Sequence, residues 1–289
     1  MSDAAVLVTG ASTGIGRACA LRLETLGFTV YAGVRREEDG IALKETAGPN
    51  LHPLLLDVTD MRAIDTAMEL MRTDRRVARL AGVVNNAGIA VGGPAELISL
   101  DDWRRQFEVN VFGVIAVIQR SLPMLRKGGG RIVNMSSIGG RVAQPFVAPY
   151  VASKHALEAI SDALRVELRP WGIQVALIEP GAVATPIWEK GVTDSTARLA
   201  GIVGLSELYG RVTERMTAIA RQQERRGVDP ARVADAVAHA LTAARPRTRY
   251  LVGSEARIAL MLRRALPDRW WDALVLRYAR LPRSPDADV

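Results

Sequence analysis

Three side chains near the middle of the sequence have the types and the spacing to move a proton. Tyr150 and Lys154 lie four residues apart, so on a helix they share one face and the ammonium can lie beside the phenol. A phenol has a pKa of about 10, but an adjacent cation stabilises the phenolate. Ser137 follows the apolar run 131–136, and its hydroxyl could bind a carbonyl or alcohol oxygen. Taken alone, Tyr150 and Lys154 at this spacing are more often a surface pair on a helix, and the other motifs of the chain must decide.

A glycine-rich turn near the start of the chain has the form of a phosphate cradle. Residues 4–9 predict a buried strand, and the amphipathic run that ends at Leu26 predicts a helix. Between them, Gly10 permits a tight turn, Gly14 lets backbone N–H groups approach a pyrophosphate, and Gly16 allows the helix to pack closely. The spacing is G-x-x-x-G-x-G, not G-x-G-x-x-G. A glycine-rich turn that binds no ligand is the alternative.

The end of the second predicted strand bears on the choice of cofactor. An acidic residue at this position would bind a ribose 2′-hydroxyl and reject a 2′-phosphate. The strand over residues 28–34 ends instead at Val34, followed by Arg35 and Arg36. A guanidinium suits a 2′-phosphate, so the sequence predicts NADP(H) in preference to NAD(H). Two exposed arginines that open a helix are the alternative.

Polar residues also lie at the ends of the third and fourth predicted strands. Asp57, in the strand over residues 52–58, lies at the sheet edge where doubly wound folds bind ligands. It is a candidate adenine contact, and a cap for the next helix would explain it almost equally well. Asn85-Asn86-Ala87-Gly88 closes the strand over residues 80–84. Its carboxamides could hold the strand end against a flat ligand, or merely form a turn.

Asn110 lies in the middle of a long predicted helix over residues 101–125. Asparagine is unfavourable inside a helix because its amide competes for backbone hydrogen bonds. We therefore expect its side chain either to face solvent or to do local polar work, such as holding a water.

The composition favours one large α/β domain. The chain has 289 residues, 48% of them hydrophobic, and strand-like and helix-like segments alternate nearly throughout. The single cysteine, Cys19, excludes an intramolecular disulfide and a Cys-x-x-Cys metal site, and we expect it in the core. Residues 1–3 hold no targeting signal, and no segment has ~18 uninterrupted apolar residues. We expect a cytoplasmic protein.

The charge is uneven along the chain. The net charge is +7, and residues 201–289 hold 16 arginines, no lysine and 10 acidic residues, a net +6. This stretch contains no basic platform interleaved with aromatic residues and no recognition motif. We expect a solvated arginine-rich face and no nucleic-acid partner.

Two late segments depart from the strand–helix alternation. Residues 186–228 form an apolar insertion within a domain over residues 1–254, and they could close as a lid over a hydrophobic substrate or simply add to the core. Residues 255–289 form an amphipathic, arginine-rich extension that Pro267 divides into two short helices. The extension could lie on an anionic membrane surface, on the domain itself or on a second subunit.

In this order, the motifs resemble those of the short-chain dehydrogenase/reductase superfamily, over roughly residues 4–253. The shared motifs are Thr9-Gly10-x-x-x-Gly14-Ile15-Gly16, Asn85-Asn86-Ala87-Gly88, Asn110, Ser137, Tyr150-x-x-x-Lys154 and Pro180-Gly181. The resemblance implies a Rossmann-type doubly wound parallel sheet of about seven strands, ordered 3-2-1-4-5-6-7, with helices on both faces. The C-terminal region is similar to that of retinol and hydroxysteroid dehydrogenases, which favours a bulky lipophilic alcohol or ketone as substrate.

The resemblance also implies a role for each motif. Tyr150 would be the general acid/base and Ser137 would bind the substrate oxygen. Lys154 would lower the pKa of Tyr150 and hold the nicotinamide ribose, and Asn110 would keep a water for proton relay. A homodimer or homotetramer is usual in the family. The implied cofactor contacts are Gly10, Ser12, Thr13, Gly14, Ile15, Gly16, Arg35, Asp57, Val58, Asn86, Ala87, Gly88, Tyr150, Lys154, Pro180, Gly181, Val183 and Thr185.

Two other functions stay open at this point. One is a regulatory protein that binds nucleotide without turnover, and the complete set of Ser137, Tyr150 and Lys154 argues against it. The other is a sugar-nucleotide epimerase or dehydratase. That branch usually has a G-x-x-G-x-x-G turn and a larger substrate domain, and the sequence has neither.

Overall fold

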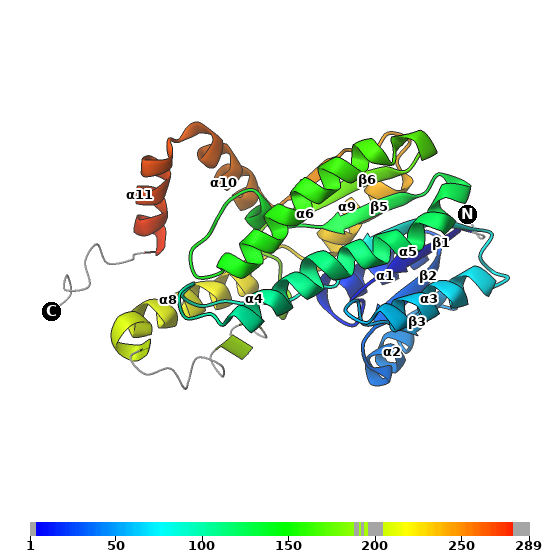
Figure 1. The fold of residues 1–289 in the computed structure, drawn as a ribbon, viewed down its shortest axis with the longest axis horizontal. Helices are drawn as coiled ribbons and strands as arrows, with labels where there is room; N and C mark the ends of the chain where they lie inside the picture. Colours follow the sequence, from blue (N-terminus) through cyan, green and yellow to red (C-terminus); the bar gives the residue numbers. More distant parts are fainter. Residues whose placement is uncertain (1–3, 188–190, 192–193, 196–204, 280–289) are drawn as a thin grey trace.

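Seven parallel strands form one sheet, in the order β3-β2-β1-β4-β5-β6-β7 (Figure 1). The computed structural model describes residues 4–187, 191, 194–195 and 205–279. The order confirms the predicted doubly wound topology. The strands are β1 (Ala4–Val8), β2 (Thr29–Val34), β3 (Leu51–Leu55), β4 (Arg79–Asn85), β5 (Arg131–Met135), β6 (Gln174–Pro180) and β7 (Arg249–Val252).

The central strands are buried along nearly their whole length. Every residue of β1 and β2 is buried, as are all residues of β6 after Gln174. A parallel sheet that is covered by helices on both faces offers no solvent side, so its strands are continuous apolar runs and not alternating ones. This explains why the apolar segments of the sequence were recognisable as strands.

Helices cover both faces of the sheet and extend beyond one end of it (Figure 1). They are α1 (Gly14–Thr25), α2 (Glu37–Lys44), α3 (Met61–Thr73), α4 (Leu100–Phe107), α5 (Gly113–Gly128), α6 (Ala148–Glu167), α8 (Leu205–Arg226), α9 (Pro230–Thr242), α10 (Ser254–Ala265) and α11 (Asp268–Ala279). Short 3-10 turns lie at Ile138–Gly140 and Arg169–Trp171.

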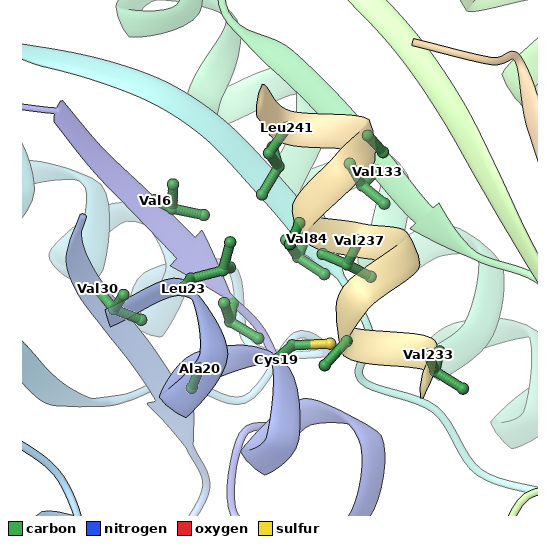
Figure 2. Close-up of a cluster of buried hydrophobic side chains, with 14 of the residues drawn as sticks. Val6, Cys19, Ala20, Leu23, Val30, Val84, Val133, Val233, Val237 and Leu241 are labelled. Carbon is green, nitrogen blue, oxygen red and sulfur yellow. The ribbon is translucent and has the colours of Figure 1, made fainter. Parts of the chain in front are cut away.

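The core consists of two apolar layers, one on each face of the sheet. In one layer, α1 and α9 pack side by side, with Cys19 and Leu23 facing Val237 (Figure 2). In the other, α3, α5 and α6 cover the opposite face, and Ile64, Val117 and Leu157 share one buried cluster. Cys19 is fully buried, and burial raises the pKa of its thiol to about 12, so it belongs to the core as predicted.

The predicted helix over residues 101–125 contains an irregularity that the sequence did not reveal. Between α4 and α5, Glu108–Phe112 forms a π-helical turn in which the N–H of Gly113 bonds to the carbonyl of Glu108. Asn110 lies inside this turn. The whole run Leu100–Gly128 is long and apolar enough to cross a membrane by length and composition, but half of its most apolar window is buried within the fold. Val114, Val117 and Leu125 pack in the core, which accounts for the apolar composition.

Some predicted boundaries were too long. The third strand ends at Leu55, so Asp57 and Val58 lie in the turn that follows it. In the insertion, α8 occupies the second half, and Trp188, Leu199, Ile202 and Val203 fall outside the described residues. Helices α10 and α11 flank Pro267 as its missing N–H predicts.

The contact between α1 and α9 should contribute strongly to stability. We expect Leu23→Ala to lower the free energy of unfolding by about 2–5 kcal/mol, because it leaves a cavity in a fully buried cluster. Leu70→Ala, in the last turns of α3, is a matched control, since its side chain is 52% exposed and the loss should stay below about 1 kcal/mol. Urea unfolding measures both. Equal losses would contradict the assignment of this layer to the core.

Candidate active site

Ser137, Tyr150 and Lys154 converge at the carboxyl end of β5. Ser137 precedes the Ile138–Gly140 turn and its Oγ accepts a hydrogen bond from the N–H of Gly139 at 3.0 Å. Tyr150 and Lys154 lie on one face of the first turns of α6, with Nζ 5.7 Å from the centre of the phenol ring. All three side chains are buried. The predicted grouping of these side chains is therefore present.

Burial dominates the ionisation of this group. It raises the pKa of the Tyr150 phenol, and a hydrogen bond with Ser137 only partly offsets this rise. Burial also lowers the pKa of Lys154 to about 8, although the nearby Glu158 carboxylate acts in the opposite direction. The ammonium donates to the carbonyl of Met135 at 2.7 Å. The lowering of the Tyr150 pKa by Lys154 stays a prediction.

Asn110 does local polar work, one of the two possibilities that the sequence left open. Its Oδ1 accepts from the N–H of Ile89 at 2.9 Å, and its Nδ2 donates to the carbonyl of Ile89 and to Ser153 Oγ. The π turn thereby ties the segment after β4 to α6. The water predicted at Asn110 stays a prediction.

Gln106 is a positioning residue that the sequence reading missed. It is fully buried, and its carboxamide accepts from the N–H of Val91 at 2.7 Å and donates to the carbonyl of Ile89 at 2.9 Å. It lies four residues before Asn110, on the same helix face, and this spacing of two carboxamides was the available signal. Together the two side chains fix the backbone of residues 89–91.

The glycine turn after β1 is locked onto the end of β4. Nδ2 of Asn86 donates to the carbonyls of Thr9 and Gly10, each at 3.0 Å, and Thr9 Oγ1 accepts from the N–H groups of Asn86 and Ala87. A Cβ at Gly10 would lie 2.8 Å from the Cα of Ala87. Gly10 also has φ of +65°, a conformation that favours glycine. The two motifs therefore form one structural unit.

This unit fits a dinucleotide. Among the described residues, no side chain is bonded to the first N–H groups of α1, and Thr13, at the cap position, makes no such bond. The cap residues of α2, α6 and α10 also make none, whereas Asp60, Ser99 and Asp229 cap α3, α4 and α9. Uncapped N–H groups at a helix start, beside a glycine turn, form a ready site for a phosphate. Ser12, Ile15 and Gly16 belong to the same turn and first helical residues.

The segment after β6 lies opposite the glycine turn. A Cβ at Gly14 would lie 3.1 Å from Cγ2 of Thr185, so Thr185 faces the cradle. Gly181 donates its N–H to the carbonyl of Val252 at 2.9 Å, directly after Pro180, and Val183 pairs with Val228 in an isolated bridge. Gly88 lies close to Asn110, since a Cβ there would be 3.4 Å from Oδ1. The glycine turn thus lies close to the segments that follow β4 and β6.

The remaining predicted contacts have other partners in the structure. Asp57 accepts from the N–H and Oγ1 of Thr59 in a local turn, and it does not cap α3, whose cap is Asp60. Val58 is buried against Gly113. Arg35 is exposed after β2, and Arg36 forms an ion pair with Asp39 at 3.2 Å. Contacts of Asp57, Val58 and Arg35 with a cofactor therefore stay predictions.

Comparison with known proteins agrees with this geometry. The family model described as short chain dehydrogenase matches residues 4–195. The chain belongs to this family. Retinol dehydrogenase 5 from Mus musculus is 36% identical over 286 residues, which cover 95% of this chain and 88% of that protein. This dehydrogenase is thus an oxidoreductase that acts on CH–OH groups with NAD(P).

Two further similarities concern cofactors. The NADPH-dependent 3-dehydrocapnine reductase from Ornithobacterium rhinotracheale is 34% identical, covering 93% of this chain and 94% of that protein. The crystal structure of a short chain dehydrogenase from Burkholderia cenocepacia in complex with NADP has a TM-score of 0.70 and 25% identity, and covers 97% of this chain and 98% of that one.

A large apolar pocket opens beside the reactive side chains of the dehydrogenase. Its volume is about 570 Å³, and Ser137 and Tyr150 are among the residues that line it. Helices α8, α10 and α11, which lie at the same end of the molecule in Figure 1, supply the outer wall with Met216, Leu262 and Trp271. Both late segments of the sequence therefore contribute to the pocket.

The loop between Ser137 and Tyr150 forms another wall and is strained. Phe146 has φ of +63°, and no other non-glycine residue of the described chain has a positive φ. Its carbonyl accepts from the N–H of Gly93 at 2.7 Å, and its ring packs edge-on against Tyr209 of α8 at 6.2 Å. An aromatic residue held in this region costs energy, which is typical of segments whose shape serves a site.

Proposed function

We propose that this dehydrogenase transfers a hydride between NADP(H) and a bulky, apolar alcohol or ketone. The observation that carries the proposal is the 570 Å³ apolar pocket, which Ser137 and Tyr150 help to line. A cavity of this size accommodates a drug-sized molecule, and its lining is mainly apolar. The reacting carbon would lie beside Ser137 and Tyr150, and the apolar body of the substrate between α8, α10 and α11.

In this mechanism each side chain has a separate task. Ser137 binds the carbonyl oxygen, and Tyr150 donates a proton to it during reduction or removes one during oxidation. Lys154 stabilises the phenolate and holds the nicotinamide ribose, and Asn110 keeps a water for proton relay. When bound, the nicotinamide supplies or accepts the hydride. Exclusion of water by the apolar wall strengthens each of these interactions.

Tyr150→Phe tests the proton-transfer role. It removes the hydroxyl and keeps the ring, so we expect kcat to fall at least about 100-fold. The affinity for NADPH should stay within about threefold of the wild-type value, since the phenyl ring still fills the site. Carbonyl-dependent NADPH oxidation and fluorescence titration measure the two quantities. Weaker cofactor binding with an unchanged rate would contradict the role.

Preference for NADP(H) is supported by the residues after β2. Val34 stands where an acid would select NAD(H), and Arg35 is exposed next to it. The NADPH-dependent relative and the NADP-bound structure are consistent with this choice.

Arg35→Ala should weaken NADPH binding about tenfold or more and change NADH binding little, because only NADPH carries the 2′-phosphate. Arg72→Ala is the control, since Arg72 lies on α3 in an ion pair with Glu69. The dissociation constants of both variants for NADPH and NADH measure whether Arg35 selects NADPH. Equal weakening of NADPH and NADH would reject the assignment.

The C-terminal helices also support contact with an anionic membrane surface. Ile258, Met261 and Trp270 are exposed large apolar side chains on α10 and α11. Arginines are interleaved with them, and this composition is typical of helices that lie at a membrane interface. An apolar substrate would then pass from the lipid to the pocket that the same helices line.

Substitutions of two adjacent tryptophans test the pocket and the membrane contact separately. Trp271→Ala should raise KM for steroid or retinoid carbonyls several-fold and leave a short aliphatic ketone unaffected, because Trp271 lines the pocket. Trp270→Ala should leave both KM values unchanged and reduce binding to phosphatidylserine vesicles, because its side chain is 70% exposed. NADPH oxidation with the three substrate classes and vesicle sedimentation provide the readouts. If neither Trp271→Ala nor substrate size affected KM, a bulky substrate would be excluded.

We further propose a cytoplasmic homodimer or homotetramer. The exposed apolar side chains of Phe112 and Val166, on the two long helical elements, support an assembly through these helices. A single, buried cysteine is consistent with a reducing compartment. A regulatory role without turnover is disfavoured by the complete proton-handling group, and an epimerase role by the glycine spacing.

A further inference from the structure

Two carboxylates are buried behind the reactive group, and the mechanism above does not use them. Glu158 lies on α6, one turn beyond Lys154, and is 5% exposed. Glu179 lies near the end of β6 and is 2% exposed. Burying a carboxylate is costly unless it is paired or hydrogen-bonded, so two of them beside a reactive lysine require an explanation.

Arginines from two other elements pair with these carboxylates. Nε of Arg249, on β7, lies 3.0 Å from Oε2 of Glu158 and 3.1 Å from Oε1 of Glu179. Arg141, which follows the Ile138–Gly140 turn, donates to Glu179 at 3.0 Å. Nη2 of Arg249 forms an ion pair with Asp162 at the surface. Each buried carboxylate is thus paired with the guanidinium of a partly exposed arginine.

The backbone brings Glu158 against the reactive residues. A Cβ at Gly140 would lie 2.8 Å from Ser136 Oγ, 3.0 Å from Cγ of Glu158 and 3.1 Å from the carbonyl of Lys154. The missing side chain therefore lets three groups meet at one point. Neither Ser136 Oγ nor Oε1 of Glu158 has a well-aligned hydrogen bond among the described residues. Arg249 therefore pairs with Oε2 of Glu158, while no aligned donor among the described residues binds Oε1.

We infer that Glu158, anchored by Arg249, is a positioning residue that keeps the Lys154 ammonium charged inside the dry site. This inference rests on the proposed function, in which Lys154 must be a cation to stabilise the Tyr150 phenolate. Glu158 does not touch substrate or cofactor in this scheme. It acts through Lys154. Neither the sequence motifs nor the family resemblance gives Glu158 this role.

The electrostatics of the neighbouring groups agree with this role. Burial lowers the pKa of Lys154, and Glu158 is the group that raises it. The pKa of Glu158 is itself raised, first by burial and also by Glu179, while Ser136 and Arg249 lower it. The charge on Glu158 therefore depends on α6, β6, β7 and the turn after β5. Asp162 and its surface partner Arg165 complete the charged groups around Arg249.

The test is the pH dependence of kcat/KM for carbonyl reduction. In Glu158→Gln the ammonium loses the carboxylate that lies one helical turn away and favours its charge, so the pH above which activity declines should be lower than in the wild type. We expect the ratio of kcat/KM at pH 8.5 to that at pH 6.5 to fall about tenfold relative to the wild type. Glu158→Asp retains the charge and should restore most of the ratio.

Two milder variants keep the test decisive if the Glu158 variants fold poorly. Ser136→Ala removes a group that favours the ionised form of Glu158. The pH above which activity declines should therefore also shift downwards, by less than in Glu158→Gln. Glu179→Gln removes a like charge next to Glu158. The pH above which activity declines should therefore stay unchanged or shift upwards. Shifts to lower pH in both variants would indicate general disruption and overturn the inference, as would an unchanged profile in Ser136→Ala and Glu158→Gln.

Failure of the proposed function gives a different result. If the wild type does not oxidise NADPH with any carbonyl, or if Tyr150→Phe is fully active, the proposed function fails before the pH profile has a meaning. If the wild type is active, Tyr150→Phe is inactive and the Glu158 variants keep the wild-type profile, only the role of Glu158 is rejected.

Discussion

The desolvation of one lysine constrains much of this structure. Lys154 is 6% exposed, and an ammonium in such a place is favoured to lose its proton unless nearby groups stabilise the charge. The carbonyl of Met135 accepts from Nζ, and Glu158 lies one helical turn away. The sheet end, the turn at Ile138–Gly140 and the start of α6 must meet closely for this to happen. Gly140 permits the approach, because any side chain there would collide with Ser136 and Glu158.

Parallel strand order places the other components around this lysine. Since all seven strands point the same way, the segments after β1, β4, β5 and β6 emerge at one edge of the sheet. Hydrogen bonds between Asn86 and residues 9–10 join the first two segments, and Asn110 joins the second to α6. The glycine turn, the segment after β4 and the start of α6 are therefore parts of one hydrogen-bonded edge. A displacement of one segment would move the others.

The pocket depends on chain that lies after most of the sheet. Helices α8, α10 and α11 supply much of its apolar wall, and Ser137 and Tyr150 line the same pocket. Because these residues come from different segments, the late helices can vary the shape of the pocket without moving Ser137 and Tyr150. The tail also exposes apolar residues to solvent, such as Trp270, next to Trp271 in the pocket wall.

The sequence by itself determined the doubly wound sheet and the grouping of Ser137, Tyr150 and Lys154, because apolar runs, glycine turns and an i, i+4 pair are local signals. Only the tertiary structure revealed the π turn at Asn110 and the role of Gln106, since both side chains bond to residues 89–91 in another segment. It also showed that burial raises the pKa of the Tyr150 phenol, which no local pattern in the sequence indicated. Glu158 and Glu179 read as ordinary acids in the sequence. Their significance comes from burial and from Arg249, which lies 91 residues beyond Glu158 along the chain.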